Sequence, residues 1–549
     1  MKKYSFMKMR YFLLVGLILS VGLFFASCDE EFLDLENPNQ VSDEVMMTPS
    51  GVRQLEVGMY RRLADAYNYF WQLYMSHIPG EYEMKETTGE GPMHQQVWNL
   101  AMTPTNVFNA WLYSDYYGIL NISNRIIEYM ETGAGTVNEL PEREFSQILG
   151  GAYFMRAFSH FYLLHSWGRP FDDDDIYGIV MHTSIVSERA QFEKERSRPS
   201  EVYAQIEKDL LAAEAILLKS AQLLPEELGR PTRGAATAFL GKVYVFKKQY
   251  AEAAVKLKQF IDENPDKTLL PYYGDNFHGE YENGPESVFE VQFADLVPTN
   301  RWQGGGTGNH YQIYTGGHGM GRDNFGVNPA IMRREDDPDA IPGDIRNFDV
   351  RDIRFSETVY SAGPNRTYVF HGDTIVIRDT LFFMNPPTRV RRSAKHTYTP
   401  KKYISNRRTA SNAGGIATDI GYENQVVMRV AEVYMLYAEA LAQLGRVSEA
   451  SEWLNKVMRR ARGYRLNETS PYDFTGNDQA AFMELLMEEK RKEFIGEQIR
   501  WYDVIRWGIA ESEVARVPGR VAYIDRAACF PIPIREMANN AKMVQNPGY

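Results

Sequence analysis

The stretch TRGAATAFLGKVYVFKKQYAEAAVKLKQFIDE, residues 232–263, decides the fold. Its apolar residues recur every three or four positions, which is the period of one face of an α-helix. Two small residues, Gly241 and Ala253, are twelve positions apart, and the large residues Leu257 and Phe260 follow them. Small residues let two helices approach closely while large ones fill the space beside the contact. The stretch therefore predicts a pair of packed helices.

A second stretch, MRVAEVYMLYAEALAQLGRVSEASEWLNKVMRRA at residues 428–461, repeats this pattern, and Ala438 and Ala450 keep the same spacing. The offsets are those of a tetratricopeptide repeat, a degenerate motif for which two copies are better evidence than one. Residues 141–167 and 478–508 look like partial further copies. Stacked helix pairs commonly offer a concave surface to protein partners, but they can equally serve only as a core.

The remaining chain alternates between helical and irregular character. Helical periodicity also marks residues 50–75, 106–131 and 199–219. Between residues 264 and 425, Gly, Asn, Pro, Asp and aromatic residues dominate, with short strand-like pieces at Ser287–Phe293 and Thr367–Arg378. A stretch of this length is too long for a simple loop in a compact domain. It therefore predicts an irregular subdomain inserted between two helical parts.

The first 27 residues have the features of a secretory signal, because a basic stretch precedes the apolar run Phe12–Phe25 and two small residues. The apolar run is shorter than the roughly 20 residues that a membrane span needs. Cys28 follows Ala26-Ser27 directly, and Cys529 is the only other cysteine. The segment looks like a bacterial lipoprotein signal with Cys28 as the lipid attachment site, and several acyl chains would anchor the protein stably. The alternative is an ordinary cleaved signal.

The composition of the chain disfavours some classes of function and favours others. The 549 residues carry a formal net charge of −12, which disfavours nucleic acid as a partner because phosphate backbones require clustered Lys and Arg. With Cys28 acylated, Cys529 would have no intramolecular disulfide partner, so stability must come from a large core. The chain contains 34 Tyr and 8 Trp, whose amphipathic rings suit recognition surfaces.

The C-terminal third contains the most distinctive local sequences. These are EEKRKEF at residues 488–494, GEQIRWYDVIRWG at 496–508, FPIP at 530–533 and QNPGY at 545–549. The first two predict a charged, well-packed helical segment in which Trp501, Val504 and Ile505 face the core. The closely spaced prolines predict an extended tail tied to the body.

Together with other stretches, these sequences resemble the SusD/RagB family of nutrient-uptake lipoproteins. The further matching stretches are Cys28 with Phe32-Leu33-Asp34, Arg156-Ala157-Phe158, Arg230-Pro231-Thr232-Arg233, Glu286-Ser287-Val288-Phe289-Glu290, Arg429-Val430-Ala431-Glu432 and Tyr437-Ala438-Glu439-Ala440. They follow the family's order over nearly the whole chain. The resemblance implies a mostly α fold, in which four tetratricopeptide-like helix pairs pack on an irregular, loop-rich inserted region with a few short strands that binds the ligand.

The implied organisation is a signal peptide at residues 1–27 and a single domain at 28–549. Within that domain we expect an N-terminal helical part at 28–263, the irregular insert at 264–425, and a C-terminal helical part with an extended tail at 426–549. Proteins of this family lie on the outer face of the outer membrane and cap a TonB-dependent transporter of the SusC kind. They capture glycans or other nutrients and have no catalytic residues, so we expect neither an enzyme nor a cofactor.

The resemblance places ligand contacts in loops before the second helix pair and in the irregular region. A glycan binder needs flat aromatic faces for sugar C–H surfaces and polar neighbours for hydroxyls. In Gly80–Ala110 the candidates are Tyr82, His94, Trp98 and Asn99. In Asn300–Phe325 they are Arg301, Trp302, Tyr311 and Tyr314, interleaved with glycines that free the backbone to expose rings. Because regular apolar spacing is sparse, we expect these rings at the surface, with packing against the helical body as the alternative.

Other site types have weaker support. Asp172–Asp175 could offer oxygen ligands to Ca²⁺ but lack the glycine and distal glutamate of an EF-hand loop, so a solvated turn is expected and no metal site is predicted. His310 and His318 lack the zinc-protease spacing, and no Gly-x-Ser-x-Gly motif occurs. The alternatives to glycan capture are a peptide or other nutrient in the same role, a glycoside hydrolase with two carboxylates, and a protein-interaction scaffold.

Overall fold

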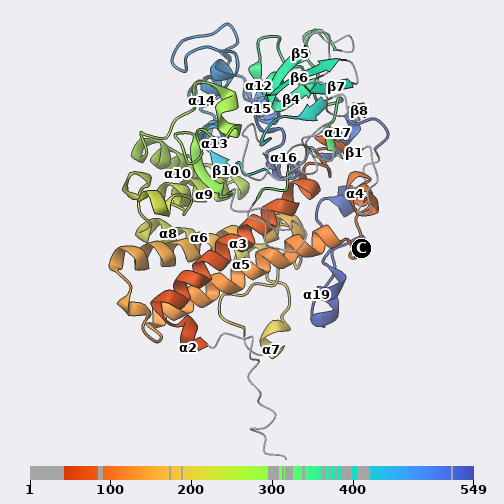
Figure 1. Cartoon of the computed structure of the whole chain (residues 1–549). Coiled ribbons are helices and arrows are strands. Elements are labelled where there is room, and N and C mark those ends of the chain that lie inside the picture. Colours follow the sequence, from red (N-terminus) through yellow and green to blue (C-terminus); the bar gives the residue numbers. More distant parts are fainter. Residues whose placement is uncertain are drawn as a thin grey trace, which may run out of the picture.

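Helices make up most of the described structure and stack against one another as pairs (Figure 1). The computed structural model describes residues 43–84, 91–171, 175–186, 189–294, 308–311, 315, 325–336, 340–361, 366–370, 373–378, 381–384, 392–393, 398–404, 421–520 and 524–549. Four successive pairs are formed by α3 (Pro49–Tyr74) with α5 (Val107–Thr132), α6 (Glu142–Trp167) with α8 (Pro199–Ile216), α9 (Arg233–Phe246) with α10 (Tyr250–Glu263), and α13 (Val430–Gln443) with α14 (Val447–Ala461). The predicted mostly helical fold with four helix pairs is confirmed.

Close approach between paired helices depends on the small residues that the sequence singles out. A Cβ atom at Gly241 on α9 would lie 2.6 Å from Cγ of Leu257 on α10, so only glycine fits this contact. Ala438 and Ala450, the corresponding residues of α13 and α14, have no exposed surface. Large side chains at these positions would push the helices apart.

Further helices surround the pairs. They are α2 (Asp43–Met46), α4 (Gly91–Trp98), α7 (Arg189–Phe192), α12 (Ile353–Thr358), α15 (Gln479–Phe494), α16 (Arg500–Trp507), α17 (Ala510–Ala515), α18 (Ile524–Ala527) and α19 (Ile534–Asn539). On α16, Trp501 and Val504 are buried and Ile505 is half-buried against the core, as the sequence predicts.

Strands are short and belong mostly to the insert. β2 (Ser287–Val291) pairs with β10 (Gln425–Arg429). A four-stranded sheet combines one strand from before the insert with three from within it, in the order β1 (Tyr82–Met84), β3 (Phe325–Val327), β9 (Tyr398–Pro400) and β4 (Val359–Ser361). A separate antiparallel sheet contains β5 (Arg366–Phe370), β6 (Asp373–Arg378), β7 (Leu381–Met384) and β8 (Arg392–Ser393). Because β1 precedes the insert in sequence, its pairing with β3 fastens the insert to the segment after α3.

A network of buried charges joins the insert to the C-terminal helices. Arg429 at the end of β10 donates to Glu286 at 2.8 Å and to Glu493 on α15 at 2.6 Å. Arg460 on α14 donates to both of these carboxylates. Burial raises the pKa of Glu493, but the charges of Arg460, Arg429 and Arg354 outweigh burial and lower it to about 2. Glu493 is therefore ionised in the folded protein.

The C-terminal residues run back along the first helix pairs. The backbone N–H of Phe530 donates to the carbonyl of Ser166 at 2.7 Å, and the Asn109 amide donates to the carbonyl of Pro531 at 2.8 Å. The side chain of Asn546 donates to the carbonyl of Trp167 at 2.9 Å. These bonds tie the tail to the helical body, and the helix α19 lies between its two proline-containing ends.

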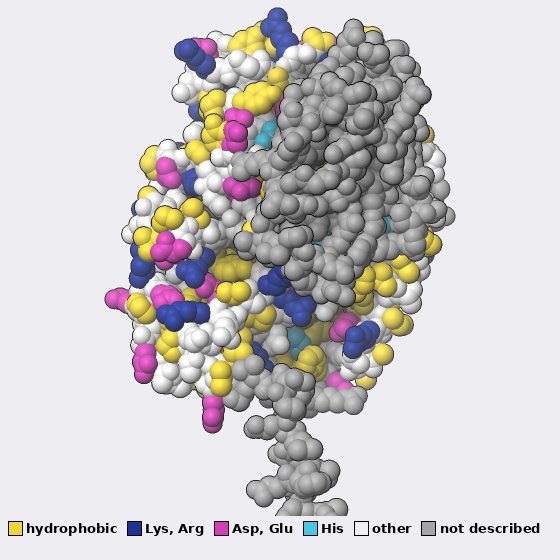
Figure 2. All heavy atoms as spheres, in the orientation of Figure 1, with side chains coloured by type: hydrophobic (Ala, Val, Ile, Leu, Met, Phe, Trp, Pro, Cys, Tyr) yellow, Lys and Arg dark blue, Asp and Glu magenta, His cyan; other side chains and the backbone are white. Residues whose placement is uncertain are grey.

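Acidic and basic side chains are interspersed on the described part of the face shown in Figure 2. Among the described helices, none combines the length and the apolarity that crossing a membrane requires.

Candidate ligand-binding surface

The short helix α4 is held against the start of α5. The side-chain oxygen of Asn106 caps α5 by accepting from the N–H groups of Phe108 and Asn109, at 3.1 and 3.3 Å. Its amide nitrogen donates to the carbonyl of Met93 on α4 at 3.0 Å. One buried side chain therefore fixes both the N-terminus of α5 and the position of α4.

Trp98 is the last residue of α4, and its half-buried ring is backed by a cation. The guanidinium carbon of Arg520 lies 4.4 Å from the ring centroid, and Nε of Arg520 donates to the Trp98 carbonyl at 3.1 Å. The same guanidinium donates to the carbonyl of Ser76 at 3.1 Å. Burial lowers the pKa of Arg520 to about 10, so the group stays charged at neutral pH. The neighbouring Asn99 is exposed.

Gly80 makes room for this arrangement. It adopts a left-handed φ of +61°, and a Cβ atom there would lie 2.5 Å from Nη1 of Arg520. The carbonyl of Gly80 accepts from the Asn328 side chain at 3.0 Å. A side chain at this position would both strain the backbone and displace Arg520 from Trp98.

Tyr82, His94 and Tyr311 are buried, so the expectation that these rings lie at the surface is wrong. The hydroxyls of Tyr82 and Tyr311 share a hydrogen bond, and the two rings pack edge to face 6.4 Å apart. His94 stacks on Phe108 at 4.5 Å and meets the edge of Phe325 at 4.9 Å. Tyr82 lies on β1 and pairs with Val327 of β3, which holds its ring in the interior. The contact between Tyr82 and Tyr311 nevertheless brings the two candidate stretches together.

A buried carboxyl precedes Tyr82. Glu81 accepts a hydrogen bond from the N–H of Gly496 at 3.2 Å, and its second oxygen has no hydrogen-bond partner among the described residues. Burial raises the pKa of Glu81 to about 7, although Arg500 and Lys402 act in the opposite direction. This buried group therefore changes its charge near neutral pH.

Arg301, Trp302 and Tyr314 lie outside the described residues, as does Cys28. Of the acidic run at 172–175, only Asp175 is described, and it pairs with Arg169 at 3.4 Å. Within the described ranges, no cluster of three His, Cys, Asp or Glu side chains could hold a metal ion.

Sequence reasoning missed Trp111. Its side chain is 45% exposed on the first turns of α5, and its ring packs edge to face on Phe108 at 5.7 Å. Polar groups lie between α4 and α5, where Thr103 donates to the Gln96 side chain at 3.3 Å. We define the α4–α5 surface as Gln96, Trp98, Asn99, Thr103, Thr105 and Trp111. The helical period offered a signal for Trp111, because it lies at the edge of the apolar stripe that contains Phe108 and Leu112.

Two family models match separate parts of this chain. The model described as "SusD family" matches residues 285–549, and the model described as "Starch-binding associating with outer membrane" matches residues 31–245. The chain belongs to the SusD/RagB family. SusD-like protein P38 of Formosa agariphila is 24% identical over 569 aligned positions, which cover all of both chains. A SusD-like protein of Bacteroides ovatus is 24% identical, with 89% of this chain and 81% of that protein covered.

Solved SusD structures share the fold. A SusD homologue from Bacteroides thetaiotaomicron aligns with a TM-score of 0.70 at 20% identity, covering 94% of this chain and 100% of that one. A laminarin-binding SusD-like protein aligns with a TM-score of 0.69 at 21% identity, covering 91% and 99%. Surface glycan-binding protein A from Bacteroides fluxus aligns with a TM-score of 0.68 at 20% identity, covering 91% and 99%.

Proposed function

We propose that this SusD/RagB protein binds an oligo- or polysaccharide at the α4–α5 surface and delivers it to a TonB-dependent, SusC-like transporter. Family membership over the whole chain carries this proposal. A half-buried tryptophan backed by a cation, next to exposed amide and hydroxyl groups, supports it further. Such a surface offers a flat apolar face for sugar C–H groups and hydrogen-bonding partners for hydroxyls.

Within this proposal the candidate residues have two roles. Trp98 and Asn99 contact the ligand, and Arg301, Trp302 and Tyr314 contribute contacts from the insert. Tyr82, His94 and Tyr311 are buried, so they support the surface instead of touching the ligand. Trp111 extends the aromatic surface on the α5 side.

Incubation with a panel of glycans separates binding from catalysis. Depletion of one glycan without new reducing ends is the expected result, because the proposed surface is built for recognition. Release of shorter products by the purified protein would instead establish a hydrolase. Depletion of peptides but of no glycan would keep the role as a transporter lid and change its cargo.

The proposed location is the exterior of the outer membrane, with a lipid on Cys28 as the anchor. Extraction in mild detergent followed by affinity capture should recover a TonB-dependent barrel with the protein. Recovery of the protein alone, while an unrelated outer-membrane complex survives the same extraction, would contradict the partnership.

A further inference from the structure

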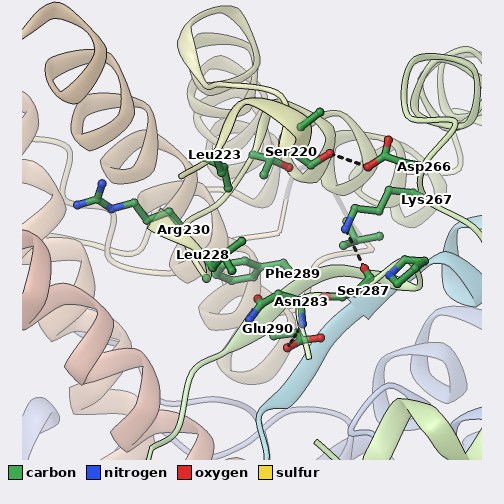
Figure 3. A pocket seen from close by; sticks show the side chains of 16 residues that line it. Ser220, Leu223, Leu228, Arg230, Asp266, Lys267, Asn283, Ser287, Phe289 and Glu290 are labelled. Atoms are coloured by element: carbon green, nitrogen blue, oxygen red, sulfur yellow. Dashed lines mark hydrogen bonds between the residues drawn. The ribbon is translucent and has the colours of Figure 1, made fainter. Parts of the chain in front are cut away.

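A second candidate site lies on the helical body, where three connections enclose a cavity of about 320 Å³ (Figure 3). Its walls come from the α8–α9 connection at residues 220–232, the turn after α10 at 266–267, and the segment 283–290 that contains β2. None of its lining residues belongs to the α4–α5 surface, and α8–α10 lie on the opposite side of Figure 1 from α4. The volume is at the lower end of the range for small-molecule sites.

Lys267 supplies a cation with unused donors. Its Nζ donates to the carbonyl of Gly284 at 2.9 Å, and no further acceptor for it occurs among the described residues. An ammonium group carries three N–H donors, so two remain for a ligand. Burial lowers the pKa of Lys267, while Asp266 and Glu290 act to raise it. The half-buried ammonium of Lys267 is therefore only partly solvated.

Of the other charged lining residues, Glu290 is already hydrogen-bonded and Arg230 points elsewhere. Glu290 accepts from the N–H of Asn283 and from the Asn424 side chain, each at 3.0 Å. Arg230 donates to Glu56 at 2.7 Å, and its guanidinium points away from the cavity in Figure 3. Lys267 is thus the cation available inside the described part of this cavity.

Hydroxyl-binding groups and an apolar wall complete the lining. Asp266 accepts from Ser220 at 3.1 Å through one oxygen, which leaves its other oxygen available. Thr232 accepts from the N–H of Ala235 at 3.1 Å, so its own hydroxyl hydrogen can still be donated. The cavity is also lined by four apolar residues, Leu223, Leu228, Val288 and Phe289, which we call its apolar wall.

We propose that this cavity, the Lys267 cavity, binds a single hexuronate residue. The carboxylate accepts from Lys267, the ring hydroxyls bond to Asp266, Ser220 and Thr232, and the C–H face of the pyranose lies on the apolar wall. A carboxylate suits the site because an ammonium pairs with it through charge-assisted hydrogen bonds. The choice of a sugar as ligand class rests on the proposed function, but the cavity and its cation do not.

The test uses the detergent-solubilised full chain and two methyl glycosides that differ only at C6, methyl glucuronide and methyl glucoside. Ligand-observed NMR titration should show saturable binding of the glucuronide and about tenfold weaker binding of the glucoside, as for loss of a hydrogen bond to a charged group. Lys267→Met keeps the side-chain length, removes the charge and should weaken glucuronide binding to the level of the glucoside. Lys267→Arg should retain a preference for the glucuronide.

A second variant checks that a loss of binding in Lys267→Met does not come from misfolding. Leu228 is 52% exposed at the mouth, so Leu228→Trp should block the cavity without touching Lys267. Trp98→Ala should leave glucuronide binding unchanged, which separates this site from the proposed glycan surface. N-acetylglycine, which carries a carboxylate but no sugar ring, is a further control ligand. The inference is overturned if the glucoside or N-acetylglycine binds as tightly as the glucuronide. It is also overturned if either cavity variant binds like the parent, or if the parent shows no saturable binding.

Discussion

The guanidinium of Arg520 lies 4.4 Å from the ring centre of Trp98, although 422 residues separate them in sequence. The cation covers one side of the indole and ties its backbone to the segment before β1. Stacking of this kind is worth about 0.5–1 kcal/mol at exposed sites and more when desolvated. In the proposed site the ligand would stack on the opposite ring face, which Arg520 leaves uncovered.

Replacing either candidate tryptophan should weaken glycan binding without unfolding the protein. Trp98→Ala and Trp302→Ala each remove an aromatic anchor, and such losses commonly cost ~2 kcal/mol, about a thirtyfold increase in Kd. Calorimetry measures the affinity, and circular dichroism with thermal melting checks the fold. Phe192→Ala, which removes a 57% exposed ring of α7, is the matched control and should bind like the parent. Unchanged affinity in both tryptophan variants would exclude these positions, whereas early melting would assign the rings to the core.

Removing the thiol at position 28 should release the protein from membranes. Cys28→Ala leaves no acceptor for the lipid, and the described helices offer no alternative span. Fractionation of cells into membrane and soluble pools checks this, with Cys529→Ala as the control because Cys529 is buried. A Cys28→Ala variant that remains in the membrane pool as firmly as the parent would refute lipid anchoring.

Neutralising Glu493 should destabilise the fold strongly. Glu493→Gln keeps the shape but leaves Arg429 and Arg460 buried without one of their counter-charges, and breaking a buried ion pair costs about 3–5 kcal/mol. Denaturant unfolding measures the difference. Glu449→Gln is the control, because Glu449 pairs with Arg446 on the surface. Its free energy of unfolding should equal that of the parent within experimental error. Equal midpoints for the two variants would contradict a structural role for the buried network.

Glu81 should make stability depend on pH in a defined direction. Its pKa is about 7 in the folded protein against an ordinary 4.5, so between these values the folded state binds more protons than the unfolded state. The free energy of unfolding contributed by Glu81 therefore falls as pH rises through this window, by at most about 3 kcal/mol.

Glu81→Gln removes this titration. The variant should gain stability relative to the parent as pH rises from about 4.5 to about 7, and the difference should stay constant above that, in denaturant unfolding. Other titrating groups are common to both proteins, so they cancel in the difference. A difference that does not change with pH would show that Glu81 ionises normally.

Local pattern predicted the helices well because apolar periodicity and small-residue spacing are properties of adjacent turns. Residues 50–75 and 106–131 became α3 and α5 almost to the residue, and Ser287–Phe293 became β2. The strand-like piece Thr367–Arg378 became the β5–β6 hairpin.

The exposure of rings could not be predicted in the same way. Tyr82 is buried because β1 pairs with Val327 of β3, 245 positions away, and a loop-like sequence gives no sign of such a partner. The charged sequence at 488–494 also gives no sign of its burial, since the arginines that pair with Glu493 come from β10 and α14. Trp98 is half-buried at the end of α4, and its role in ligand binding stays a prediction.

The hydrogen bonds of the C-terminal tail have a consequence for the order of folding. The carbonyls of Ser166 and Trp167, at the end of α6, are satisfied by Phe530 and Asn546. A chain that emerges N-terminus first must therefore leave the Ser166 carbonyl without this partner until its last residues arrive, whereas the Trp167 carbonyl can already accept from Arg196. Closure over such a sequence distance is slow, because the entropy of a large loop is lost before the contact forms. Loss of a few terminal residues would thus damage the first helices of the protein more than the last.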